Sequence, residues 1–119
     1  MDREQRLRLE ARAKIMKAMA HPSRLYILEQ LSREEHCVCE LREGIGADLS
    51  TVSKHLSVLR EAGIVEMEKR GVQVFYRLKV PCILKFMGCI EAVLERTARE
   101  QACLIPDRNP LLKPEMTDE

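Results

Sequence analysis

The sequence predicts a mainly α-helical winged helix-turn-helix domain with a small β-hairpin. Apolar residues repeat at helical spacing along most of the 119-residue chain, and this period changes to strand-like alternation within residues 64–78. With two Phe, two Tyr and no Trp, the core must be aliphatic and small, which favours association of chains. We therefore expect one dimeric domain over residues 1–105 and a flexible acidic tail over 106–119.

The first two helices are expected on either side of a proline. Residues 3–20 are rich in good helix formers and predict the first helix. Its apolar stripe consists of Leu7, Ala11, Ile15 and Met19. Pro22 does not continue that helix but suits the first turn of the second one. The core face expected for the second helix consists of Leu25, Ile27, Leu28 and Leu31.

A helix-turn-helix is expected over residues 38–62, after a charged connector over residues 32–36. Its first helix covers about residues 38–45, with Gly44 and Gly46 marking its end. Its second helix ends at Gly63, which supplies a left-handed cap. The buried positions expected in this second helix are Val52, Leu56 and Leu59.

Residues 64–78 predict a two-stranded hairpin, or wing, that turns at Arg70-Gly71. Its second strand is expected to bury every other residue, with Val72, Val74, Tyr76 and Leu78 alternating with Gln73, Phe75 and Arg77. A last helix follows over residues 81–103, opened by a proline. Its apolar side consists of Phe86, Ile90, Val93, Leu94 and Ala98. The helices over 1–20 and 81–103 are the expected dimerisation elements.

Charge is distributed unevenly although the formal net charge is only +1. Residues 1–24 hold seven Lys or Arg against three acids, and residues 91–119 hold four against seven. The charged beginning of the chain predicts no signal peptide and no membrane partner, hence a cytoplasmic protein. In that reducing compartment the five cysteines are not expected to form a disulfide framework.

The outward side chains of the helix-turn-helix and the wing predict an interface with double-stranded operator DNA. Near the start of the second helix these are Ser50, Thr51, Ser53, Lys54 and His55, and the hairpin adds Lys69, Arg70 and Gln73. Short polar side chains and cations suit base edges and phosphates. Any soluble helix has a polar outer face, so it is the order of the elements that favours DNA binding.

Four stretches resemble the ArsR/SmtB family of metal-responsive repressors: AMAHPSRLYIL, HCVCEL, LSTVSKHLSVLREAGIVE and GVQVFYRL. Together they span most of residues 18–78. The resemblance implies a homodimer held by the first and last helices. It also implies that this dimer binds an operator of two-fold symmetry and releases it when an inducer binds.

Cys37 and Cys39 stand where the first helix of the helix-turn-helix begins, and thiolates select thiophilic ions. Residues two apart on a helix point to nearly opposite sides, so the two sulfurs can share an ion only if the helix end is distorted. The stretch CVCEL resembles the arsenic- and antimony-sensing branch of the family, which implies a trivalent metalloid as inducer. Cadmium or lead also suit thiolates, and no organic cofactor is expected.

A third sulfur ligand has no obvious place in the sequence. In the arsenic-sensing branch a third cysteine often follows three residues after the second, where this chain has Arg42. Cys103 is our first candidate and Cys89 the second. Cys82 and Cys89 share a helical stripe with apolar residues, which favours packing.

The remaining metal-ligand candidates are weak. His36 lies beside a surface turn and is expected to be solvated rather than to bind zinc. The family's other common site uses Asp and His on the last helix, which here contains neither, so zinc or nickel sensing through it is not expected.

Two other functions fit the same residues. In a redox or sulfide sensor, two cysteines would form a disulfide or polysulfide link instead of holding an ion. In a metal-buffering protein, DNA binding would be absent. An enzyme is not expected, because no catalytic cluster or phosphate-binding glycine loop can be assembled from this chain.

Overall fold

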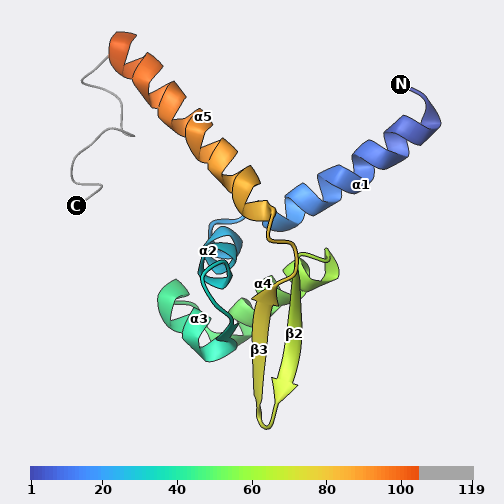
Figure 1. Cartoon of the computed structure of the whole chain (residues 1–119), viewed down its shortest axis with the longest axis vertical. Coiled ribbons are helices and arrows are strands. Elements are labelled where there is room, and N and C mark those ends of the chain that lie inside the picture. Colours follow the sequence, from blue (N-terminus) through green and yellow to red (C-terminus); the bar gives the residue numbers. More distant parts are fainter. Residues whose placement is uncertain (105–119) are drawn as a thin grey trace. The chain divides into compact units, whose positions relative to one another are not determined.

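The computed structural model describes residues 1–104, with side chains as far as Ala102. The expected tail over 106–119 lies outside the described residues. Contacts divide the chain into two units, Met1–Pro81 and Cys82–Glu119. The elements of the first unit are α1 (Arg3–Met19), α2 (Pro22–Leu31), β1 (His36–Cys37), α3 (Val38–Ile45), α4 (Leu49–Glu61), β2 (Val65–Arg70) and β3 (Gln73–Leu78). The second unit contributes α5 (Ile83–Leu104), and Figure 1 labels most of these elements.

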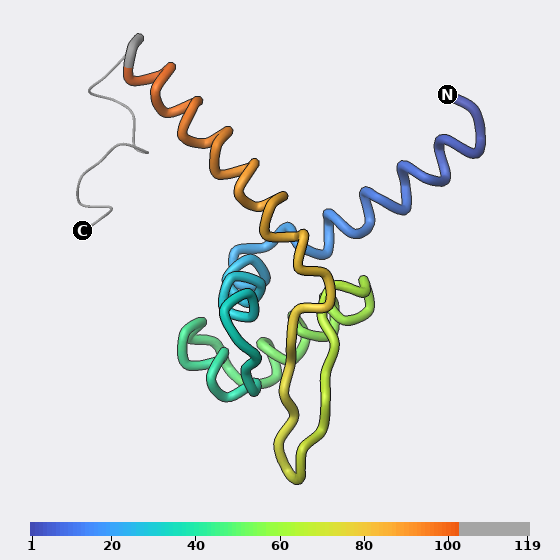
Figure 2. Tube along the Cα trace, viewed as in Figure 1, coloured from blue at the N-terminus to red at the C-terminus, as the bar shows by residue number. Residues whose placement is uncertain are grey.

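Helix α1 begins with a reciprocal cap at Asp2 and packs on its own unit only at its end. The Asp2 carboxylate accepts the backbone N–H of Gln5, whose side chain accepts the N–H of Asp2. Of the α1 residues, Ala18 and Met19 are buried. The members of the expected apolar stripe upstream of Met19 are exposed in the single chain. Figure 2 shows why, because most of α1 runs away from the other helices of its unit.

Helix α2 buries a narrower face than the sequence predicts. Ile27 and Leu28 are completely buried and Leu31 nearly so, whereas Leu25 is 37% exposed. The buried face is set by the contacts of α2 with α3, α4 and β3. Leu25 lies at the edge of that face, so its assignment to the core is wrong.

The sheet has three antiparallel strands in the order β1-β3-β2. The connector predicted over residues 32–36 therefore ends in a strand, since His36 pairs with Tyr76 and Cys37 with Phe75. A strand of two residues carries no periodicity by which the sequence could reveal it. Residues 74 to 78 of β3 are all partly buried, so the predicted alternation is wrong. Val72 lies in the turn and is 98% exposed.

The helix-turn-helix forms as predicted and contains the core of the first unit. Gly46 ends α3 with a φ of 80°, a left-handed conformation that glycine adopts without strain. The side chains buried between α3, α4 and the start of β2 are Leu41, Val52, Leu56, Leu59, Ile64 and Val65. Gly44 lies directly against the ring of Tyr26, which brings α2 and α3 close together.

Helix α5 begins two residues later than Pro81, after a turn in which Cys82 C=O accepts the N–H groups of Lys85 and Phe86. Its apolar side is exposed in the single chain, apart from the buried Ala98. The exposed members are Phe86, Ile90, Val93 and Leu94. Among the described helices, none combines the length and the apolar character needed to cross a membrane.

Candidate nucleic-acid interface and thiol pair

The first turns of α4 present short polar side chains to solvent. Asp48 caps the helix by accepting the N–H of Thr51 at 2.8 Å. Hydrogen bonds from the Thr51 side chain and then its backbone lower the pKa of the Asp48 carboxyl. Because α4 buries its apolar side, four of the five predicted DNA contacts lie exposed on the other: Ser50, Thr51, Ser53 and Lys54. This arrangement suits insertion of α4 into a major groove.

His55 is not an outward residue, contrary to the sequence prediction. It is half-buried, its Nδ1 lies 3.1 Å from Nη1 of Arg24, and its ring centroid lies 4.4 Å from that of His21. Burial, and then the charges of His21 and Arg24, lower the pKa of His55. Its partners lie more than 30 residues away in sequence, so helical periodicity alone cannot reveal them.

The wing carries its three predicted contact residues at or near its tip, but only one of them, Arg70, is held in ion pairs within the described structure. Lys69 and Gln73 are exposed, and Lys69 forms no ion pair with any described residue. Arg70 is paired with Glu35 and with Glu68, the latter at 2.8 Å, and stacks over a phenylalanine ring. Hydrogen bonds to Glu35 and then Glu68 raise the pKa of Arg70.

Arg77 extends the same ion-pair network along the sheet. It contacts Glu66 and Glu68, each at 2.9 Å. Hydrogen bonds from Arg70 and then Arg77 lower the pKa of Glu68. The sequence prediction missed this network, although the alternation of Glu and basic residues in β2 is a signal that could have indicated it. Much of the positive charge near the wing tip is thus balanced by carboxylates.

The two adjacent cysteines have different surroundings. Cys37 is buried, belongs to β1 and forms the N-cap of α3, whereas Cys39 is exposed on the first turn of that helix. The Glu40 carboxylate accepts the backbone N–H of Cys37 at 3.1 Å. This bond and then the His36 side chain lower the pKa of Glu40. His36, 3.1 Å from Glu40 with 18% of its side chain exposed, is paired rather than solvated, which corrects the prediction.

The other predicted ligands, Cys103 and Cys89, belong to the second unit of the chain. Among the side chains that the structure describes, residues 1–102, no group of three or more His, Cys, Asp or Glu is suited to a metal ion. The side chain of Cys103 lies outside the described residues. Cys89 and Cys82 belong to the second unit and are exposed in the single chain, so packing of their helical stripe stays a prediction.

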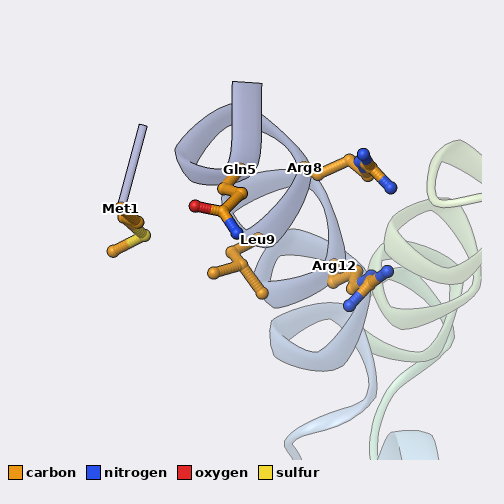
Figure 3. A pocket seen from close by; sticks show the side chains of 5 residues that line it. All are labelled: Met1, Gln5, Arg8, Leu9 and Arg12. Atoms are coloured by element: carbon orange, nitrogen blue, oxygen red, sulfur yellow. The ribbon is translucent and has the colours of Figure 1, made fainter. Parts of the chain in front are cut away.

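Two hollows are found in the first unit. One, of about 270 Å³, lies along the start of α1 and is lined by Met1, Gln5, Arg8, Leu9 and Arg12 (Figure 3). Its lining comes from one end of the chain, and Arg8 and Arg12 extend from the helix toward solvent. The other, of about 460 Å³, lies between α1 and the end of α4 and is lined by Ala11, Lys14, Ile15, Lys17, Ala18, Val58, Glu61 and Ala62.

Comparison with known proteins decides the family. The model of "Bacterial regulatory protein, arsR family" matches residues 21–67, the segment from the N-cap of α2 into β2. The HTH-type transcriptional regulator Rv0081 of Mycobacterium tuberculosis (strain ATCC 25618 / H37Rv) is 32% identical over 97 residues, which are 81% of this chain and 85% of that protein. The chain belongs to the ArsR family. This ArsR protein is a DNA-binding transcriptional repressor and not an enzyme.

Comparison with solved structures confirms the winged helix-turn-helix fold. The crystal structure of M. tuberculosis Rv0081 matches with a TM-score of 0.71 and 30% identity, over 86% of this chain and 99% of that one. The crystal structure of the transcriptional repressor BigR from Xylella fastidiosa matches with a TM-score of 0.65 and 35% identity, over 78% of this chain and 96% of that one. A third match is the homodimeric winged helix-turn-helix domain Mb0332 from Mycobacterium bovis, a possible ArsR-family regulator. Its TM-score is 0.72 and its identity 25%, over 84% of this chain and 93% of that one.

Proposed function

We propose that this ArsR repressor leaves its operator when a thiophilic ion, first of all trivalent arsenic or antimony, binds the thiolates of Cys37 and Cys39. The observation that carries the proposal is the position of Cys37. This residue is at once a strand residue, paired with Phe75, and the N-cap of α3. A ligand that moves Cys37 therefore acts on the wing and on the helix-turn-helix together.

Ligation requires such a movement. Cys37 is buried and Cys39 is exposed, and the two residues occupy the N-cap and the second position of a helix. Side chains so spaced diverge, so a shared ion must draw Cys37 out of its place. That step would cost the β1 pairing with β3 and the hydrogen bond from Cys37 N–H to Glu40.

The distortion has a short path to the DNA-binding surface. Helix α3 packs on α4, and the two are joined by the turn that begins at Gly46. The ion must bind the DNA-free form more tightly than the DNA-bound form. Reversing a 99:1 equilibrium requires about 5.5 kcal/mol of differential affinity, which thiolate ligation of a soft ion can supply.

A third ligand to the ion is also part of the proposal. Cys103 remains our first candidate for a third sulfur and Cys89 the second, from the same chain or from a partner chain. Cadmium and lead are the alternative inducers, because they also accept thiolate-rich sites.

We further propose that the active form is a homodimer built on α1 and α5. Both helices expose apolar side chains that a soluble chain normally covers, and their exposed members include Leu7, Ile15, Met16, Phe86, Ile90 and Leu94. The Mb0332 domain, similar over 84% of this chain, is a homodimer. Two copies of α4 would then face an operator of two-fold symmetry.

A redox or sulfide switch is the second candidate function. It is favoured by the exposed thiol of Cys39 and by the absence, among the described side chains of residues 1–102, of a cluster with three metal-ligand side chains. Mass spectrometry of protein treated with peroxide or persulfide distinguishes the two. A bridging adduct formed without metal would favour the switch.

Thiol counting tests the metalloid site directly. Arsenite is added to the reduced protein without oxygen, and the thiols that still react are counted. We expect the loss of at least two reactive thiols per chain at stoichiometric arsenite. Cys37→Ala and Cys39→Ser should each abolish tight uptake, and Cys82→Ser is the matched control that should retain it. Full uptake by both Cys37 and Cys39 variants would place the ion elsewhere.

A further inference from the structure

Three side chains connect the beginning of α2 to the middle of the recognition helix α4. His21 is the N-cap of α2, where its Nδ1 accepts the backbone N–H of Ser23 at 3.0 Å. Arg24, one turn further on, reaches His55 on α4 with its Nη1 3.1 Å from Nδ1. The two imidazole rings lie 4.4 Å apart at 44°. This cluster belongs neither to the thiol pair nor to the exposed face of α4.

The donors in the cluster fix the protonation of both rings. A backbone N–H and a guanidinium can only donate hydrogen bonds, so the Nδ1 atoms of His21 and His55 must both accept. Each ring therefore carries its single proton on Nε2 and is neutral. An added proton would go to an Nδ1 atom. That atom would then be a donor, facing the N–H donor with which it had formed a hydrogen bond.

Protonation would also bring like charges together. A cationic His55 would face the guanidinium of Arg24 and, if both rings were protonated, a second cation at His21. His21 and Arg24 are the charged or titratable groups that act on the His55 ring. No carboxylate among residues 1–104 forms an ion pair with any of the three. No compensating carboxylate therefore contacts the cluster within the described structure.

Arg24 depends on this link for its own placement. Its Nε is buried and has no hydrogen-bond partner, so the bond from Nη1 to His55 is the one that orients the guanidinium within the described structure. A buried, unsatisfied donor is costly. Losing the acceptor on His55 would leave the guanidinium without that bond too, and Arg24 would be expected to turn toward water.

We propose that His21, Arg24 and His55 form a proton-sensitive link that positions α4 on α2, so that acidification weakens DNA binding. His55 is then a positioning residue, and its neighbours Ser53 and Lys54 carry the contacts with DNA. The link rests on the DNA-binding function but not on the identity of the inducer. The lowered pKa of His55 agrees in direction, because the neutral ring is the form that the intact link stabilises.

The direction in which DNA affinity changes with pH distinguishes this proposal from a direct contact between His55 and DNA. A state in which the link is broken binds a proton at the ordinary histidine value of 6.5, and the intact link binds it only at lower pH. The stability that the link gives to the position of α4 is thus complete above 6.5 and is lost as the pH falls below it. If His55 instead contacted phosphate as a cation, DNA affinity would rise on acidification.

The experiment is fluorescence anisotropy of the reduced, metal-free protein on a duplex from upstream of its own gene, from pH 8 to 5.5 at constant ionic strength. We expect the dissociation constant to rise about tenfold over this range, a typical coupling between two sites. The variants His21→Asn and His55→Asn place an amide oxygen near the position of each Nδ1 and do not titrate. Each should keep neutral-pH affinity and flatten the pH profile, and the double variant should be nearly flat.

His36→Asn is the matched control, because it removes the third histidine and should leave the profile unchanged. Affinity that rises or stays constant on acidification in the wild type, or a double variant with the wild-type profile, would overturn the proposal. So would unfolding of the wild type at pH 5.5, seen by circular dichroism. Nitrogen-15 NMR of the free protein is independent of DNA: both rings should carry the Nε2–H tautomer at pH 8, and an Nδ1–H tautomer would contradict the link.

Discussion

Arg70 at the end of β2 forms an ion pair with Glu35, the residue immediately before β1. The pair joins the two outer strands of the sheet across β3, and Glu68 completes it from the other side of the guanidinium. A cation held by two carboxylates is poorly placed to attract phosphate, because its field is largely cancelled. Lys69, next to it in sequence, forms no ion pair with a carboxylate among the described residues.

The first prediction concerns the salt dependence of DNA binding. Lys69→Ala should reduce the slope of log K against log salt by about 1, the value of one lost phosphate contact. Glu35→Gln should increase DNA affinity, because it removes one of the two carboxylates paired with Arg70. Glu34→Gln is the matched control for a simple loss of negative charge, since Glu34 forms no ion pair within residues 1–104. Equal gains from Glu35→Gln and Glu34→Gln would contradict the assignment of Arg70.

The second prediction concerns the contact between α2 and α3. A Cβ on Gly44 would lie 1.8 Å from Oη of Tyr26, so Gly44→Ala must displace the ring. We expect a loss of about 1–3 kcal/mol in the free energy of unfolding, as for overpacked cores. Gly88→Ala on α5 meets nothing within 4 Å and should be neutral or stabilising by about 0.5–1 kcal/mol. Urea unfolding measures both.

A double-mutant cycle isolates this contact. In a Tyr26→Ala background, Gly44→Ala should lose most of its cost, because the clashing ring is gone. The same cost in both backgrounds would mean that Gly44 is required for another reason.

The third prediction concerns the cap of the recognition helix. Asp48→Ala removes the acceptor of the Thr51 N–H and should lower the melting temperature at pH 7, whereas Asp48→Asn keeps an acceptor and should lower it less. The native carboxyl has a lowered pKa, so its contribution is complete above its ordinary value and is lost as the pH falls through the lowered one. Thermal unfolding at pH 7 and pH 3 should therefore show the difference between wild type and Asp48→Asn shrinking in acid. A constant difference would contradict it.

The fourth prediction separates DNA binding from sensing. Lys54→Ala should weaken binding and reduce the salt slope by about 1, without changing the response to arsenite. Cys37→Ala and Cys39→Ser should keep DNA affinity and lose that response. Anisotropy titrations with and without arsenite measure both properties. A Lys54 variant with wild-type affinity would remove this residue from the interface.

The sequence predicted the elements whose signals are local. The helix over residues 38–45, its glycine end at Gly46 and the apolar positions of α4 were all predicted from periodicity and capping, and the structure confirms them. Short-range rules suffice there because helical hydrogen bonds and caps connect residues three or four positions apart. The order of the elements and the family resemblance supplied what periodicity does not, the DNA-binding function.

The errors concern residues whose surroundings are set by distant parts of the chain. Strand β1 exists because Cys37 pairs with Phe75, and His55 is half-buried because Arg24 reaches it from another helix. Neither contact leaves a periodic signal near the residue concerned. The apolar side of α5 is a different case, since the sequence predicts the stripe correctly and the structure shows it exposed in the single chain.

The most direct test of a thiol-controlled repressor is fluorescence anisotropy of the reduced protein on DNA from upstream of its own gene, titrated without oxygen with arsenite, cadmium and zinc. The account predicts tight binding in the absence of ions and release at stoichiometric arsenite, with zinc ineffective. Tight binding that no ion reverses would contradict the metalloid site and favour redox or sulfur chemistry at the same cysteines.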